Sequence, residues 1–186
     1  MTYGTLPPGG YPSSSKLFHW LVAISVIIQA PLGVIIGNAE LGAWQDRLYN
    51  FHKSMGVLIL ILMVLRLLNR LIVGAPAPEP TIAPWQRSLS SAVHGLLYVL
   101  LILQAIIGYL ANSAFGAGTP FFGLFEIPPM IANNEPLSNT LFMFHRWIGI
   151  ALILLVGLHV AAALQHYFIQ RDGVLQRMLP QALGGR

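Results

Sequence analysis

The chain contains no cysteine, and this absence removes several kinds of site at once. Without thiols there are no disulfides, no thiolate ligands to a metal and no cysteine-held iron–sulfur clusters. Charged residues are also scarce, at 9% of 186 residues, whereas 55% are hydrophobic. The mean hydropathy of +0.68 lies well outside the averages of soluble domains. The composition therefore indicates a membrane protein without a soluble catalytic module, and no nucleic-acid partner is expected.

Four apolar stretches are each long enough to cross a bilayer, which takes about 20 residues. They occupy residues 17–36, 51–73, 89–111 and 141–169. We expect an all-α, integral membrane four-helix bundle that forms one domain over residues 1–186, with no internal repeat and with the lipid bilayer as its surroundings. Residues 1–15 are rich in Gly, Pro and Ser rather than basic and then apolar, so the first span is expected to be a permanent helix and not a cleaved signal peptide.

The basic residues near the ends of the spans predict the orientation. One side has Lys16, Arg66, Arg70, Arg87, Arg171, Arg177 and Arg186. The other side has Arg47, Lys53 and Arg146, together with the acidic residues Glu40, Asp46, Glu126 and Glu135. This asymmetry predicts that both termini face the cytoplasm. The long aromatic loop between the third and fourth spans is then outside, and we expect it to pack across the outer mouth of the bundle.

Six histidines stand out in so apolar a chain, and four of them share a local pattern. Each of the four is followed one helical turn later by glycine or alanine, and residues four apart are stacked neighbours on a helix. The pairs are His19 with Ala23, His52 with Gly56, His145 with Gly149, and His159 with Ala163. A small neighbour leaves room for a flat, bulky group beside the imidazole, and a porphyrin held through its iron is such a group. The pattern therefore predicts four haem ligands.

The directions of the helices sort these four histidines into two levels. His52 and His145 are expected near the outer face, and His19 and His159 nearer the cytoplasmic face. Since 14 residues separate His145 from His159, one face of the fourth helix presents ligands about 21 Å apart in depth. We expect one haem b between each pair, and a bis-histidine iron passes single electrons because it has no open position. His166 shares a face with His159 and is an alternative inner ligand.

The other two histidines, His94 and His166, lack the small neighbour and are expected at the cytoplasmic level, near Lys16. Imidazole titrates near neutral pH, so such side chains suit hydrogen bonding and proton exchange with a quinone head group. Alternatively, they bind haem propionates or face the lipid headgroups.

Several segments resemble the bacterial cytochrome b561 family of four-helix, di-haem, quinone-linked proteins. They are LFHWLV (17–22), FHKSMG (51–56) through Arg66, VHGLLY (93–98), TPFFGLFEIPP (119–129), FHRWIG (144–149) and GLHVAAALQHY (157–167). The resemblance covers nearly the whole chain. It implies two haems b on His19, His52, His145 and His159, and a cytoplasmic quinone site with His94 and His166, in a multi-pass protein of the bacterial inner membrane.

The best-understood activity of that family is superoxide oxidase, and the resemblance implies that superoxide is oxidised to oxygen on the outer side while ubiquinone is reduced on the inner side. Arg47, Lys53 and Arg146 lie near the outer ligands and are expected to steer the anion. Alternatively, Lys53 and Arg146 pair with haem propionates or lipid phosphates. A second hypothesis is an electron-transfer subunit that carries electrons from quinol to a periplasmic redox protein or anchors a hydrogenase or formate dehydrogenase. A non-redox membrane scaffold is a third hypothesis.

Overall fold

Four long helices make up most of the computed structural model, which describes residues 10–79 and 81–179. They are α1 (Ser13–Asn38), α2 (Gln45–Val73), α3 (Pro84–Ala114) and α4 (Glu135–Gln165). Each is long and apolar enough to cross a membrane, which confirms the expected all-α membrane bundle. The helices begin four to six residues before the apolar stretches, because hydropathy detects only the part of a helix that matches the hydrocarbon layer.

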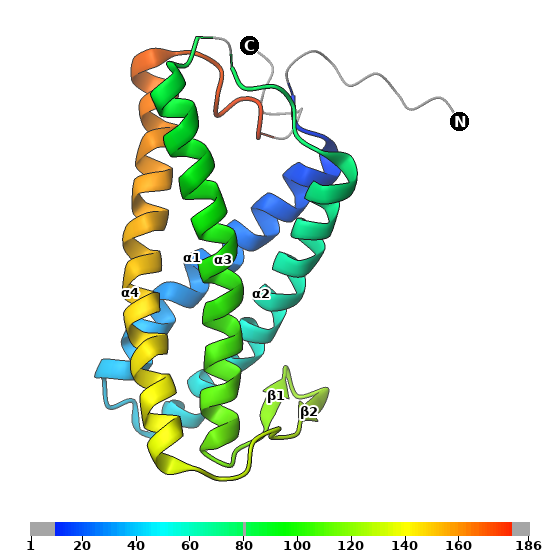
Figure 1. Cartoon of the computed structure of the whole chain (residues 1–186). Helices are drawn as coiled ribbons and strands as arrows, with labels where there is room; N and C mark the ends of the chain where they lie inside the picture. The colour runs from blue at the N-terminus through cyan, green and yellow to red at the C-terminus, as the bar shows by residue number, and fades with distance from the viewer. Residues whose placement is uncertain (1–9, 80, 180–186) are drawn as a thin grey trace.

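The helices alternate in direction, so that the N-termini of α1 and α3 lie at the same end of the bundle (Figure 1). We call this the proximal end, and the opposite one, which carries a small β-hairpin, the hairpin end. Packing is closest between α1 and α2, α2 and α3, and α3 and α4. The backbones of α1 and α4 make few contacts within the described residues, and α1 runs at a steep tilt behind the other helices in Figure 1.

The buried core lies between α1, α2 and α3. Val22, Ile59 and Met63 form its centre, and the half-buried side chains around them include Val26, Leu62, Tyr98, Leu101 and Ile102. Most other apolar side chains are exposed on the outside of the bundle, as expected where the surroundings are lipid tails rather than water.

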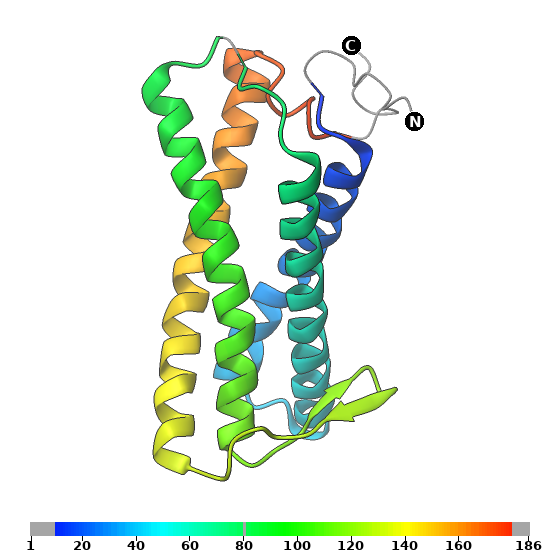
Figure 2. The ribbon, with the colours of Figure 1, turned by 45° about the vertical axis from the view of Figure 1, so that its right-hand side comes forward.

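The loop after α3 forms an antiparallel hairpin of β1 (Thr119–Phe121) and β2 (Phe125–Ile127), with Phe121 opposite Phe125. Its position corrects the expectation that the loop lies across the mouth of the bundle, because the hairpin stands beside α2 (Figure 2). The hydroxyl of Ser54 fixes it there: this group accepts from the Phe122 N–H at 2.9 Å, and its single hydrogen is shared between the Pro120 carbonyl at 3.0 Å and the Asn50 carbonyl at 2.8 Å. The strands turn at Phe122 and Gly123, both with positive φ.

The segment that follows α4 returns across the proximal end. A single π-helical turn, η2 (His166–Gln170), continues α4, and Arg171 then turns the chain with φ 53°. Trp20 Nε1 on α1 donates to the Met178 carbonyl at 3.0 Å, and Arg177 Nη2 donates to the Ala77 carbonyl at 2.7 Å. These bonds tie residues 171–179 to α1 and to the connection between α2 and α3.

Candidate functional site

Two pairs of histidines face each other across the bundle, one at each end. At the hairpin end, the rings of His52 on α2 and His145 on α4 have centroids 6.2 Å apart and planes at 81°. At the proximal end, the rings of His19 on α1 and His159 on α4 are also 6.2 Å apart, with planes at 71°. The structure thus brings together the same pairs that the sequence placed at common depths, and α4 contributes one member to each.

The spacing within each pair fits a single metal ion held between two imidazoles. A bond from histidine nitrogen to a metal is about 2 Å long and the ring centroid lies about 1 Å behind the nitrogen, so two axial imidazoles have centroids about 6 Å apart. Both pairs match this distance. In addition, the Nδ1 atoms of His19 and His52 are buried without a hydrogen-bond partner in the described structure, which is uncommon for polar atoms in a complete interior. The residues present therefore fit two bis-histidine haems.

His145 has its ring nitrogens fixed by the neighbouring helix. Its Nδ1 lies 3.0 Å from the backbone carbonyl of Gln104 on α3. Because a carbonyl oxygen only accepts, the hydrogen resides on Nδ1, and Nε2 keeps the lone pair that a metal requires. The side chain of Gln104 returns the bond, since its Nε2 donates to the His145 carbonyl at 2.9 Å.

The backbone carbonyl of His52 accepts a hydrogen bond from α1, as that of His145 does from α3. Gln29 Nε2 donates to the His52 carbonyl at 2.9 Å. Neither Gln29 nor Gln104 can be recognised from the sequence, because an amide inside an apolar helix has no pattern of its own. Both amides keep a buried Oε1 without a partner in the described structure.

The glycines one turn after these histidines have a different neighbour from the expected one. A Cβ atom on Gly149 would lie 3.1 Å from Gln104 Nε2, and a Cβ on Gly56 would lie 3.8 Å from Gln29 Nε2. Each of these two glycines thus gives space to a glutamine amide from the next helix, and the interpretation that they also make room for a porphyrin stays a prediction.

Two other glycines lie directly against the imidazoles. A Cβ on Gly33 of α1 would be 3.0 Å from His52 Cε1, and a Cβ on Gly108 of α3 would be 2.7 Å from His145 Cε1. No real Cβ sits as close as the second of these, so Gly108 is required for the observed position of the ring. Neither glycine was predicted from the sequence, because neither follows a histidine at helical spacing.

The proximal end gathers further polar side chains around His159. The ring of His94 lies 5.3 Å from that of His159, closer than two ligands of one metal would lie, and Ser90 Oγ is 3.3 Å from His94 Nδ1. Arg66 Nε on α2 donates to the Tyr98 hydroxyl at 3.1 Å. The Arg66 charge also acts on His94 and His159. Intramembrane arginines are costly and usually functional, but in the sequence Arg66 stands out only as a basic residue near the end of a span and as part of the family resemblance.

His166 and Lys16 both lie at the proximal end, but His166 is engaged elsewhere than expected. Its Nδ1 bonds the carboxylate of Asp172, and both side chains are largely buried. The structure records no ring contact between His166 and His94 among the described residues. His159, and not His166, is the residue that faces His19, so the geometry favours His159 over the alternative inner ligand. Lys16 is half-buried in the first turn of α1.

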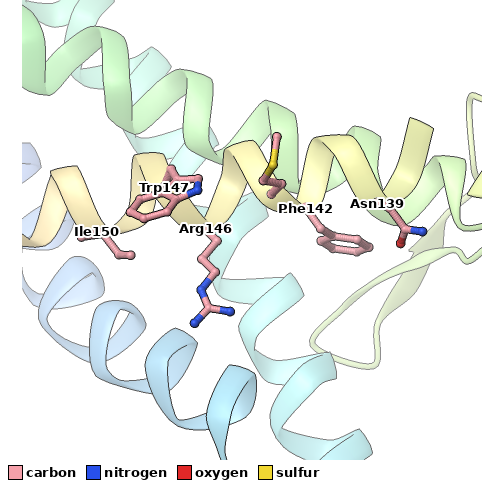
Figure 3. A pocket seen from close by; sticks show the side chains of 6 residues that line it. Asn139, Phe142, Arg146, Trp147 and Ile150 are labelled. Atoms are coloured by element: carbon pink, nitrogen blue, oxygen red, sulfur yellow. The ribbon is translucent and has the colours of Figure 1, made fainter. Parts of the chain in front are cut away.

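The three basic residues of the hairpin end lie on different surfaces. Arg47 stacks over the ring of Trp44, 5.2 Å from its centroid, and Lys53 is half-buried within electrostatic range of Asp46 and Glu126. Arg146 is exposed and projects from α4 between Phe142 and Trp147 (Figure 3). It lines a shallow surface pocket together with Asn139, Phe142, Met143, Trp147 and Ile150.

Comparisons with known proteins agree over nearly the whole chain. The sequence profile described as Prokaryotic cytochrome b561 matches residues 10–181. Cytochrome b561 homolog 2 of Escherichia coli is 34% identical over 176 residues, which cover 94% of each chain. Probable superoxide oxidase CybB of Yersinia pestis is 32% identical over 166 residues, which cover 89% of this chain and 93% of that protein. Cytochrome b562 of Cereibacter sphaeroides is 24% identical over 187 residues, with 91% and 95% covered.

Proposed function

The chain belongs to the prokaryotic cytochrome b561 family of b-haem proteins that transfer electrons across membranes, and from this premise we propose that it holds two haems b and links the two sides of the bacterial inner membrane. His52 and His145 hold one haem at the hairpin end. His19 and His159 hold the other at the proximal end. A haem with two imidazole ligands supplies one-electron transfer with no open position for oxygen.

The observation that carries this proposal is the recurrence of one geometry at two depths. Each pair has the same 6.2 Å between ring centroids, and α4 presents its two histidines 14 residues apart, a rise of about 21 Å along the helix. The protein orients the ligands and excludes water. The Gln104 carbonyl fixes the His145 tautomer, and the apolar side chains around the bundle keep water away.

At the proximal end we place the quinone site. His94, His166 and Lys16 are the side chains proposed to hold the ubiquinone head group and exchange its protons, and Asp172 orients His166 through Nδ1. The positive charge of Arg66 acts on His94 and on the nearby ligand His19, and there it favours added negative charge on a reduced head group. We propose, in line with the distribution of basic residues, that this end of the bundle and both termini face the cytoplasm, where protons for quinone reduction are available.

At the hairpin end the proposed substrate is superoxide. Two superoxide anions lose one electron each and leave as oxygen, while one ubiquinone at the proximal end gains two electrons and two protons to become ubiquinol. Support comes from the Yersinia pestis relative, which is described as a probable superoxide oxidase, and from Arg47, Lys53 and Arg146 around this end. Asp46 and Glu126 near Lys53 act against the attraction.

A second function fits the same electron path in the opposite direction, from quinol to a periplasmic redox protein. The observation that favours it is the acidic pair Asp46 and Glu126 beside Lys53, since mixed charge suits a protein partner better than a small anion.

The deciding experiment mixes purified, haem-loaded protein with a superoxide source and follows the haem α-band. We expect rapid reduction that superoxide dismutase abolishes, and then reoxidation when ubiquinone is added. Haem that superoxide leaves oxidised, but that ubiquinol reduces, assigns the chain to the second function. Protein that binds no haem overturns both.

A further inference from the structure

Contrary to the expectation of no internal repeat, the two halves of the bundle repeat one arrangement of residues. On α1, His19 is followed by Gln29 after ten residues and by Gly33 after four more. On α3, His94, Gln104 and Gly108 follow at the same spacings. The partner helices α2 and α4 each carry the pattern Phe-His-x3-Gly, at residues 51–56 and 144–149. The helix pairs α1–α2 and α3–α4 therefore share one arrangement of these residues, and each pair is called a copy of it.

The contacts between the helices repeat together with the residues. In each copy the glutamine amide donates to the backbone carbonyl of the histidine on the partner helix, at 2.9 Å in both cases. The histidine ring in turn lies against the glycine that follows the glutamine. The glycine that follows the histidine faces the amide, most closely at Gly149. In each copy a histidine, a glutamine and two glycines therefore pack together, once around His52 and once around His145.

A glutamine amide that only filled space at these positions would destabilise the fold. Gln29 Oε1 and Gln104 Oε1 are buried without a donor in the described structure, and an unpaired buried acceptor is costly. A leucine or methionine of similar volume avoids that cost. The same unfavourable group occurs in both copies, so its amide N–H must supply something that an apolar side chain does not.

The amide supplies a second donor to a carbonyl that already belongs to the helix. This bond fixes the turn that carries the histidine relative to the neighbouring helix. In one copy the loop of bonds is closed, because His145 Nδ1 donates back to the Gln104 carbonyl at 3.0 Å. Ring orientation in a ligand histidine is normally set by such a bond to its second nitrogen.

We propose that Gln29 and Gln104, with Gly33 and Gly108, are positioning residues that hold the His52 and His145 rings nearly perpendicular, at the observed 81°. The proposal rests on the proposed function, in which these two histidines are axial ligands of one haem. These two glutamine–glycine pairs act on the hairpin-end haem alone. The repeat is not kept at the proximal end, where the residue 14 positions after the histidine is His159 on α4 but Arg66 on α2.

The first test replaces each amide in the haem-loaded protein with methionine, which has similar volume but no N–H. In a low-spin ferric haem, the largest electron paramagnetic resonance g value reports the angle between the two imidazole planes. We expect Gln104→Met and Gln29→Met each to shift the g value of the hairpin-end haem and to leave that of the proximal haem in place. Gln104→Met keeps the backbone carbonyl that accepts from His145 Nδ1, so a changed g value reports the loss of the side-chain N–H alone.

Gln45→Met is the matched control for the amides. Gln45 is also a half-buried amide of α2 at the hairpin end, and its Nε2 contacts a backbone carbonyl, that of Ile36, but it touches neither histidine. We expect this variant to change stability without changing either g value. A shift as large as that of Gln104→Met means that any lost amide bond disturbs the haem, and overturns the proposal.

A second test does not depend on removing a hydrogen bond. Gly108→Ala places a methyl group 2.7 Å from the present position of His145 Cε1, and Gly33→Ala places one 3.0 Å from His52 Cε1, so each ring must turn or retreat. Gly157→Ala and Gly37→Ala, on α4 and α1, meet nothing within 4 Å and serve as controls. We expect spectral shifts or loss of the hairpin-end haem in the first two variants and unchanged haem spectra in the controls.

The outcomes separate this proposal from the one it rests on. Unchanged g values in the methionine and alanine variants, with both haems bound, overturn the positioning role but leave the ligands in place. A hairpin-end haem that remains in His52→Ala and His145→Ala overturns the ligand assignment itself. If Gln104→Met does not accumulate, the paired comparison of Gly108→Ala with Gly157→Ala decides the question.

Discussion

At the scale of single residues, the imidazoles divide into those that face another imidazole at ligand distance and those that do not. His52 and His145 form one such pair, and His19 and His159 form the other. His94 lies too close to His159 to share a metal with it, and His166 is bonded to Asp172. The proposed division into four ligands and two quinone-site residues therefore follows contacts as well as sequence position.

This division predicts which haem each histidine holds. His145→Ala should remove the hairpin-end haem and leave the proximal one, because only one of the two irons loses a ligand, and the haem content should fall from two per chain to one. His159→Ala should do the converse. Pyridine haemochrome assay with redox titration measures both the number and the identity of the remaining haem. Retention of two haems in His145→Ala, or loss of both in a folded protein, contradicts the pairing.

The residues that the sequence did not reveal share one property: their roles depend on a neighbouring helix. Gln29 and Gln104 act on carbonyls across a helix interface, and Gly33 and Gly108 matter because of rings on the next helix. Periodicity within one helix contains no information about which residue lies opposite. The histidines were found because their chemistry is rare in apolar spans, whereas glycine and glutamine are recognised only from packing.

At the scale of elements, α4 is the helix on which both proposed haem sites depend. It carries His145 and His159 on one continuous helix (Glu135–Gln165), so the angle between the two side chains is set by helix geometry alone. The other two ligands come from separate helices, α1 and α2. Any change in the number of residues between the two α4 histidines therefore alters one site relative to the other.

An insertion in α4 tests this dependence. One alanine inserted after Leu154 rotates everything beyond it by about 100°, which turns His159 away from His19 while His145 stays in place. We expect loss of the proximal haem only, measured as one haem per chain with the spectrum of the hairpin-end haem. One alanine inserted after Leu164 lies beyond His159 and is the control, which should keep both haems. Two haems in the first variant show that the ligand is not carried by a rigid α4.

The elements also show where hydropathy was sufficient and where it was not. The four apolar stretches predicted four spanning helices, and the structure has them, extended at their ends by polar turns such as that at Ser13. The hairpin was not foreseen, because its position depends on Ser54, a single hydroxyl on another element that bonds Pro120 and Phe122.

At the scale of the whole molecule, the hairpin end of the bundle carries charges of both signs. The formal net charge is +4, and the hairpin end combines Arg47, Lys53 and Arg146 with Asp46 and Glu126 close to Lys53. The field at the proposed superoxide site is thus a sum of opposing contributions. A positive sum favours the approach of the superoxide anion.

This field predicts the salt dependence of the reaction. If superoxide is the donor, Lys53→Gln combined with Arg146→Gln should slow haem reduction several-fold at low salt and much less at physiological salt, where screening acts beyond about 8 Å. Asp46→Asn should accelerate it, because the carboxylate opposes the attraction. Stopped-flow mixing with superoxide across a salt series measures each rate. Rates independent of salt in all variants contradict steering, and quinone reduction at the other end serves as the internal control.

The open seam between α1 and α4 has a consequence for biogenesis. Each of these helices packs on its own hairpin partner, and their backbones make few contacts with each other, yet His19 and His159 face one another across this seam. The two helix pairs are thus joined mainly between α2 and α3. If His19 and His159 hold the proximal haem as proposed, the haem bridges the seam between α1 and α4, and protein made without haem should be cleaved by proteases faster than haem-loaded protein, because a ligand stabilises the folded state that binds it.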